Sequence, residues 1–332
     1  MNEDFLHGGA LDIIAQRYPD APMPWIDLST GINPWSWPVE KCQPVSLAHL
    51  PTKSEYQNCV QALSSYLNAP SEHILLAPGS ELLIRLLPTI LNPQKVVIHS
   101  PIYGDHINTW TTAKCEIIET KSPLTYADSA DCIVICNPNN PDGHAYSREE
   151  LDEALNKLSA HNGYLIIDEA YADLYPDLSL ADCAGRKGLI ILRSIGKFFG
   201  LAGLRLGAIL AEPEILKAMQ DRLGVWSVST QALHIGAAAY RDFKWHEETR
   251  SRLKSEIQKL DQILNSNSIT QITGTNLYRF INIENAHKAW DVLISKGIYT
   301  RRFDWTNNHL RIGLPTNADA SNRLAQALSL LR

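Results

Sequence analysis

Short apolar runs alternate with segments of helical periodicity through the central part of the chain. Seven runs have the length and apolar content of β-strands, at residues 73–77, 95–99, 115–119, 131–136, 163–168, 189–194 and 204–211. The run DCIVIC at 131–136 is almost continuously apolar, which is typical of a strand covered on both faces. Because helical segments separate the strands, the pattern predicts a largely parallel seven-stranded sheet with helices on both faces.

The pattern changes after about residue 244. Leu253, Ile257 and Leu260 recur on one stripe, which predicts a long amphipathic helix that bridges two domains. The residues that follow alternate short strands with helices and indicate a smaller α+β domain. A chain of 332 residues is too long for one ordinary core. We therefore expect an α/β protein with an irregular Pro- and Trp-rich N-terminal arm (1–36), a large domain (37–240) and a small C-terminal domain (241–332).

Composition excludes several classes of protein. The net charge of −6 argues against nucleic acid as the main partner, since phosphate-binding surfaces carry a basic excess. The N-terminus lacks the features of a signal peptide, and no apolar run reaches the ~20 residues of a membrane helix. The six cysteines form no CxxC pair, so we interpret them as reduced, mostly buried thiols and expect no metal site. These features predict a cytoplasmic protein with no membrane partner.

Polar side chains follow the predicted strands at the points where ligands bind to parallel sheets. Ser80 and Glu81 follow 73–77 together with Gly79, Tyr103 follows 95–99, and Asn140 follows 131–136. Asp168 ends the strand 163–168 and Tyr171 lies just beyond it, and Ser194 ends the strand 189–194 with Lys197 just beyond it. Such a set matches the needs of pyridoxal 5′-phosphate (PLP). The aldehyde of PLP needs an amine, its pyridine nitrogen needs a carboxylate, and its phosphate needs a helix N-terminus.

Three motifs carry a resemblance to the class I and II aminotransferases, which are PLP enzymes of fold type I. NPNNPDG (137–143) resembles NPxxPTG, DEAY (168–171) resembles DxxY, and SIGKFFGLAGLRLG (194–207) resembles the lysine element of that family. The resemblance covers nearly the whole chain in the right order. It implies the fold of aspartate aminotransferase, PLP as cofactor, and a homodimer.

The resemblance assigns roles to individual positions. Lys197 would form the Schiff base with PLP and move protons, Asp168 would pair with the pyridine nitrogen, and Tyr171 would act on the phenolic oxygen; these three are the expected catalytic residues. Asn140 would bind the same oxygen, and Tyr103 would stack on the ring. The phosphate would be held by Gly79, Ser80, Glu81 through its backbone, Ser194 and Arg205. Arg311 would bind the substrate carboxylate, which a planar guanidinium grips through two hydrogen bonds.

A narrower resemblance points to one branch of the family. HGG (7–9), STGINP (29–34) and PIYGDHINTW (101–110) are similar to threonine-phosphate decarboxylases of cobalamin biosynthesis. The branch implies decarboxylation of L-threonine O-3-phosphate to (R)-1-amino-2-propanol O-2-phosphate. It also implies substrate contacts from His7, Asn33 and Arg301. Arg301 and Arg302 face opposite sides of a strand, so at most one is expected at the site, and we choose Arg301.

One other activity stays open at this point. A histidinol-phosphate type of aminotransferase, using 2-oxoglutarate, would need the same residues, and the two reactions differ in which Cα bond is held perpendicular to the ring. Gly196 and Leu50 stand where those aminotransferases carry Ser and Tyr, which favours the decarboxylase. A nucleotide-binding oxidoreductase is disfavoured because no GxGxxG follows a predicted strand.

Overall fold

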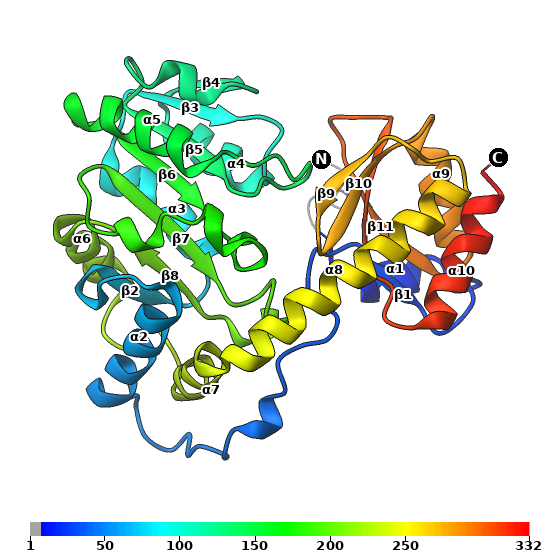
Figure 1. Cartoon of the computed structure of the whole chain (residues 1–332), viewed down its shortest axis with the longest axis horizontal. Helices are drawn as coiled ribbons and strands as arrows, with labels where there is room; N and C mark the ends of the chain where they lie inside the picture. The colour runs from blue at the N-terminus through cyan, green and yellow to red at the C-terminus, as the bar shows by residue number, and fades with distance from the viewer. Residues whose placement is uncertain (1–7, 332) are drawn as a thin grey trace. The chain divides into compact units, whose positions relative to one another are not determined.

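The computed structural model describes residues 8–331, which form two compact units (Figure 1). The larger unit contains residues 36–140 and 144–246, and the smaller contains residues 8–35, 141–143 and 247–331. The segment predicted as an arm thus contributes almost all of its described residues to the smaller unit. Among residues 8–331, no helix has both the length and the apolarity needed to cross a bilayer.

A seven-stranded sheet forms the centre of the larger unit. Its strands are β2 (Ile74–Ala77), β3 (Lys95–His99), β4 (Glu116–Thr120), β5 (Cys132–Cys136), β6 (Tyr164–Asp168), β7 (Leu189–Ser194) and β8 (Gly207–Leu210). They lie in the order β2-β8-β7-β6-β5-β3-β4. β8 is antiparallel to both of its neighbours, and the other strand pairs are parallel. The predicted mostly parallel sheet is confirmed.

Helices cover the sheet of the larger unit. They are α2 (Lys53–Leu67), α3 (Ser80–Leu91), α4 (Gly104–Thr112), α5 (Arg148–Ala160), α6 (Pro213–Leu223) and α7 (Thr230–Arg241). Every residue of β5 is buried, as expected for a strand with protein on both faces. Three 3₁₀ turns, at Ala172–Leu174, Pro176–Leu178 and Ala181–Cys183, lie in the connection between β6 and β7.

One helix is shared by the two units along the chain. α8 (Phe243–Ser266) begins in the larger unit and continues in the smaller one. The predicted apolar stripe is buried, since Leu253, Ile257 and Leu260 are at most 2% exposed. The long amphipathic helix expected from the sequence is therefore confirmed.

The smaller unit is an α+β structure built on a five-stranded sheet. Its strands are β1 (Ile26–Leu28), β9 (Ile272–Thr275), β10 (Tyr278–Asn282), β11 (Ile298–Arg302) and β12 (His309–Gly313), in the order β1-β11-β12-β10-β9. β1 pairs with β11 in parallel, whereas the other pairs are antiparallel. Its remaining helices are α1 (Leu11–Arg17), α9 (Ala286–Ser295) and α10 (Ala318–Ser329).

The expectation that the N-terminal segment is irregular was wrong in part. It contains helix α1 and strand β1, and Figure 1 shows the blue β1 in the same sheet as the orange β11. A strand of three residues is too short for its periodicity to be recognised. Its pairing is also non-local, because Ile26 lies opposite Ile298.

Candidate active site

The turn between β2 and α3 forms one wall of the candidate site. Gly79 has φ +92°, a conformation that glycine adopts readily and other residues avoid. A Cβ atom on Gly79 would lie 2.6 Å from Nη2 of Arg205, so the absence of a side chain lets the guanidinium approach the backbone. α3 begins at the next residue, Ser80, and its first N–H groups have no partners within the helix.

The ends of β7 and β8 complete this wall. Ser194 is the register partner of Gly207, and a Cβ atom on Gly207 would lie 2.6 Å from the backbone nitrogen of Ser80. Ser80 and Ser194 therefore lie close to the N-terminus of α3, where Arg205 also approaches. A helix N-terminus with two hydroxyl groups and a guanidinium can bind a phosphate group. The structure brings together these predicted phosphate-binding residues.

Asp168 ends β6 and is held by two hydrogen-bonding groups. Its Oδ2 lies 3.0 Å from Nε2 of His106, and its Oδ1 accepts from the backbone N–H of Ala170 at 3.0 Å. Asp168 is 5% exposed and His106 only 1%. These contacts fix the orientation of a carboxylate that would otherwise lose its hydration without compensation.

Two neighbours of Asp168, His106 and Cys136, were not predicted from the sequence. His106 lies three residues after Tyr103 on α4, so helical spacing from that predicted ring contact could have revealed it. Within residues 8–331, the ligand atoms of His106, Cys136 and Asp168 all lie within 4.8 Å of one another, as in metal sites. Burial, and then Asp168, raise the pKa of the Cys136 thiol well above its usual value. A neutral thiol at this position can donate a weak hydrogen bond to the carboxylate of Asp168.

Lys197 follows β7 in a turn whose neighbouring residues are buried. The next two residues, Phe198 and Phe199, are fully buried, which limits the movement of the backbone that carries the lysine. Lys197 itself is half-buried, and its Nζ lies 5.8 Å from the ring centroid of Tyr171. The amine and the phenol predicted to act on one cofactor are therefore neighbours.

The loops after β3 and β5 bring Tyr103 and Asn140 to this edge of the sheet. The side-chain amide of Asn139, which is fully buried, donates to the carbonyl oxygen of Pro101 at 2.9 Å and so joins the two loops. Burial, and then the carboxylate of Asp105, raise the pKa of Tyr103 well above its usual value, so its ring stays neutral. The side chain of Glu81 lies 2.9 Å from Arg85, which leaves only its backbone for the phosphate.

The predicted substrate residues that the structure describes, Asn33, Arg301 and Arg311, lie in the smaller unit. Arg311 on β12 is 7% exposed, donates from Nη2 to the carbonyl oxygen of Ser29 at 2.8 Å, and is the register partner of Arg301 on β11. Arg302 instead packs its guanidinium on the ring of Trp290 at 4.0 Å. Arg301 and Arg311 thus share one face of the sheet. Asn33 is buried, with its Oδ1 accepting from the N–H of Trp35 at 3.0 Å, and His7 lies outside the described residues.

The structure also shows what the hydroxyl of Tyr56 contacts. In the sequence Tyr56 follows Leu50, the position at which the resemblance to histidinol-phosphate aminotransferases would place a tyrosine. Its hydroxyl accepts a 2.8 Å hydrogen bond from the backbone N–H of Leu76 in the same chain. The phenol therefore supports strand β2.

Comparison with known proteins gives a consistent picture. The model of the family "Aminotransferase class I and II" matches residues 47–328. A threonine-phosphate decarboxylase from Pseudomonas aeruginosa is 36% identical over 97% of this chain and 96% of its own. One from Sinorhizobium sp. is 33% identical over 99% of both chains. A histidinol-phosphate aminotransferase from Sinorhizobium meliloti, solved in complex with pyridoxal-5′-phosphate, has a TM-score of 0.83 at 17% identity, over 96% of this chain and 94% of its own.

Proposed function

Because this chain belongs to the class I and II aminotransferase family, we propose that it is a PLP-dependent threonine-phosphate decarboxylase. It would convert L-threonine O-3-phosphate to (R)-1-amino-2-propanol O-2-phosphate and CO₂, a step of cobalamin biosynthesis. The observation that carries this proposal is the similarity to two threonine-phosphate decarboxylases over nearly the full length of the chain. We also propose a cytoplasmic location, since its cysteines are free thiols.

The larger unit has the donors that PLP requires. Gly79, Ser80, Ser194 and Arg205 would hold the phosphate at the N-terminus of α3, with the backbone of Glu81 beside them. Gly79 supports this assignment, because a side chain at that position would collide with Arg205. Tyr103 would stack on the ring, and Asn140 would bind its phenolic oxygen.

The bound cofactor would supply an aldehyde that takes up an amine and a pyridine ring that accepts an electron pair from Cα. Asp168, oriented by His106, would keep a negative charge beside the pyridine nitrogen. Tyr171 would donate from its hydroxyl to the phenolic oxygen. Lys197 would bind the aldehyde before the substrate does, and its Nζ would deliver the proton that replaces CO₂ on Cα.

The smaller unit has residues suited to an anionic substrate. Arg301 and Arg311 carry two guanidinium groups on one face of the sheet, and the substrate carries a carboxylate and a phosphate. Arg311 would bind the carboxylate, and Arg301 would bind the phosphate with His7. Asn33 would contact the substrate from the segment that follows β1. Fixing both anionic groups selects the conformer in which the Cα–carboxylate bond breaks.

We further propose that the protein is a homodimer. The larger unit exposes several large apolar side chains, namely Leu47, Leu50, Val225 and Trp226, each at least 58% exposed. Large apolar side chains that pair with another protein become covered, which removes them from water. A second copy of the chain would cover them.

The test is to incubate PLP-loaded protein with L-threonine O-3-phosphate in the absence of a 2-oxo acid. We expect one CO₂ and one aminopropanol phosphate per substrate consumed, and no product with Lys197→Ala. Thr89→Ala, an exposed change on α3, is the control and should match the wild type. Absence of CO₂, together with amino transfer from histidinol phosphate to 2-oxoglutarate, would contradict the decarboxylase and establish an aminotransferase.

A further inference from the structure

A buried ion cluster lies in the larger unit, on residues that neighbour those of the candidate site in the sequence. It consists of Arg193 on β7 and the carboxylates of Glu169 and Asp173, and each of the three is at most 4% exposed. Nη1 of Arg193 donates to Oε2 of Glu169 at 2.8 Å, and its Nη2 donates to Oδ1 of Asp173. One guanidinium therefore joins two carboxylates in the interior.

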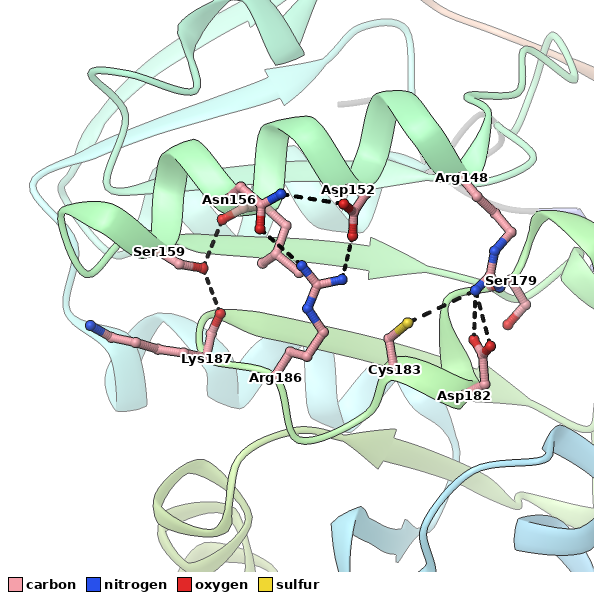
Figure 2. A network of polar contacts seen from close by, with 10 residues as sticks. Arg148, Asp152, Asn156, Ser159, Ser179, Asp182, Cys183, Arg186 and Lys187 are labelled. Atoms are coloured by element: carbon pink, nitrogen blue, oxygen red, sulfur yellow. Dashed lines mark hydrogen bonds and ion pairs between the residues drawn. The ribbon is translucent and has the colours of Figure 1, made fainter.

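Neighbouring groups donate further hydrogen bonds to both carboxylates. Glu169 accepts from the hydroxyl of Ser179 at 2.5 Å and from the N–H of Leu180 at 3.0 Å. Asp173 accepts from the hydroxyl of Tyr66 at 2.9 Å. Figure 2 shows Arg148 of α5 near Ser179, whose carbonyl oxygen accepts from that arginine. The cluster thus reaches from α2 to the turns that follow β6.

Because burying charged groups costs desolvation free energy, this cluster is an inefficient way to stabilise a fold. Burial raises the pKa of the Glu169 carboxyl, even though Arg193 and Ser179 act in the opposite direction. Buried ion pairs often stabilise a protein no more than apolar side chains of the same volume would. A role in fixing geometry explains the cluster better than a role in overall stability.

The cluster's place in the chain indicates which geometry it fixes. Glu169 lies between Asp168 and Tyr171, and its backbone N–H donates to the carbonyl oxygen of Leu192 at 2.9 Å. Arg193 comes directly before Ser194 and four residues before Lys197. Two segments that carry candidate catalytic groups are therefore joined through the backbone and through the side chains of Glu169 and Arg193.

We propose that Glu169, Arg193 and Asp173 are positioning residues that hold Asp168 and Tyr171 at a fixed distance from Lys197. This inference rests on the proposed PLP chemistry, because it concerns the same three groups. The cluster touches neither cofactor nor substrate in this role. It acts through the turn at 168–173, whose register against β7 it sets.

Glu169→Gln tests this role because it keeps the shape of the side chain and removes its charge. We expect the PLP-free variant to bind PLP roughly tenfold more weakly than the PLP-free wild type. We also expect kcat to fall by about tenfold to a hundredfold with little change in KM, as when a residue that orients a catalytic group is lost. The pH at which the absorbance of bound PLP changes should also shift. Hydrogen exchange in residues 168–180 of PLP-free protein should become faster.

The matched control is Asp152→Asn, which breaks an ion pair with Arg186 on the surface of the same unit (Figure 2). It should leave PLP affinity, the pH profile and exchange at 168–180 as in the wild type. Arg193→Lys keeps the charge and should retain more PLP affinity than Glu169→Gln does. If Glu169→Gln does not fold, Asp173→Asn and Arg193→Lys take its place in the same measurements.

The outcomes separate this inference from the proposed function. Variants that lose thermal stability but keep wild-type PLP affinity and pH profile would show that the cluster is only structural, and would overturn the inference. A wild-type protein that binds PLP but releases no CO₂ would contradict the decarboxylase alone. The PLP titrations and exchange data would then still decide the role of the cluster.

Discussion

At the scale of single residues, Tyr56 links the stability of the larger unit to pH. Burial raises the pKa of its phenol to about 12. The unfolded chain would ionise Tyr56 near pH ~10, before the folded chain does. Its contribution to stability is therefore fully present below pH ~10 and is lost as the pH rises toward 12.

Tyr56→Phe should have opposite consequences at neutral and alkaline pH. At pH 7 the N–H of Leu76 loses its acceptor, so the free energy of unfolding should fall by about 1 kcal/mol. Between pH 9 and 12, the variant should lose less stability than the wild type, because the titrating phenol is gone. Urea unfolding across this range measures both effects. Tyr126→Phe is the control, since no hydrogen bond of its hydroxyl is found among the described residues; an equal effect there would contradict the assignment.

Single residues also show how far the site could be predicted from sequence. The carboxyl end of each strand and the turn after it were enough to select Asp168, Ser194 and Lys197, because this edge of such a sheet binds ligands. His106 and Cys136 were missed because their importance comes from contact with Asp168 across neighbouring elements. Arg193 likewise looked like part of an apolar strand, and only its buried partners distinguish it.

At the scale of elements, helix α2 begins with a capping box whose contribution can be measured. The hydroxyl of Thr52 accepts from the N–H of Glu55, and the carboxylate of Glu55 accepts from the N–H of Thr52 at 2.7 Å. That backbone hydrogen bond and His234 lower the pKa of Glu55 to about 2. The contribution of this carboxylate is therefore present above pH ~4 and is lost as the pH falls toward 2.

Thr52→Ala should destabilise the protein by about 1 kcal/mol, because a helix N-terminal N–H loses its acceptor. Thermal and denaturant unfolding at pH 7 would measure the loss. Ser65→Ala, at an exposed position within the same helix, should leave stability nearly unchanged. Equal destabilisation by both changes would mean that the cap adds nothing beyond helix propensity.

Some helices and strands could be predicted from their sequences, and others could not. The seven strands of the larger sheet were found because each is an apolar run bounded by turn residues, and the local sequence determines both features. Strand β1 and the 3₁₀ turns after β6 were not found. β1 depends on pairing with β11, and the turns depend on contacts such as those of Glu169 with Ser179 and Leu180.

At the scale of the whole molecule, the smaller unit depends on a strand from the other end of the chain. Leu28 on β1 is 1% exposed, so Leu28→Ala should cost about 2–5 kcal/mol of unfolding free energy. Hydrogen exchange should become faster in β11 and β12, while β6 and β7 keep their protection. Met23→Ala is the control in the same segment, because Met23 is 74% exposed. Uniform loss of protection in both sheets would contradict a local effect.

The pairing of β1 with β11 also sets an order of events during synthesis. All seven strands of the larger sheet lie between Ile74 and Leu210, so that sheet can close while the ribosome is still extending the chain. β1 emerges earlier, yet its partner β11 is made near the end of the chain, after roughly tens of seconds at about 5–20 residues per second. Throughout that interval Ile26 and Leu28 form an unpaired apolar edge, which is prone to aggregation. The nascent chain is therefore most vulnerable at its first strand, long after that strand has left the ribosome.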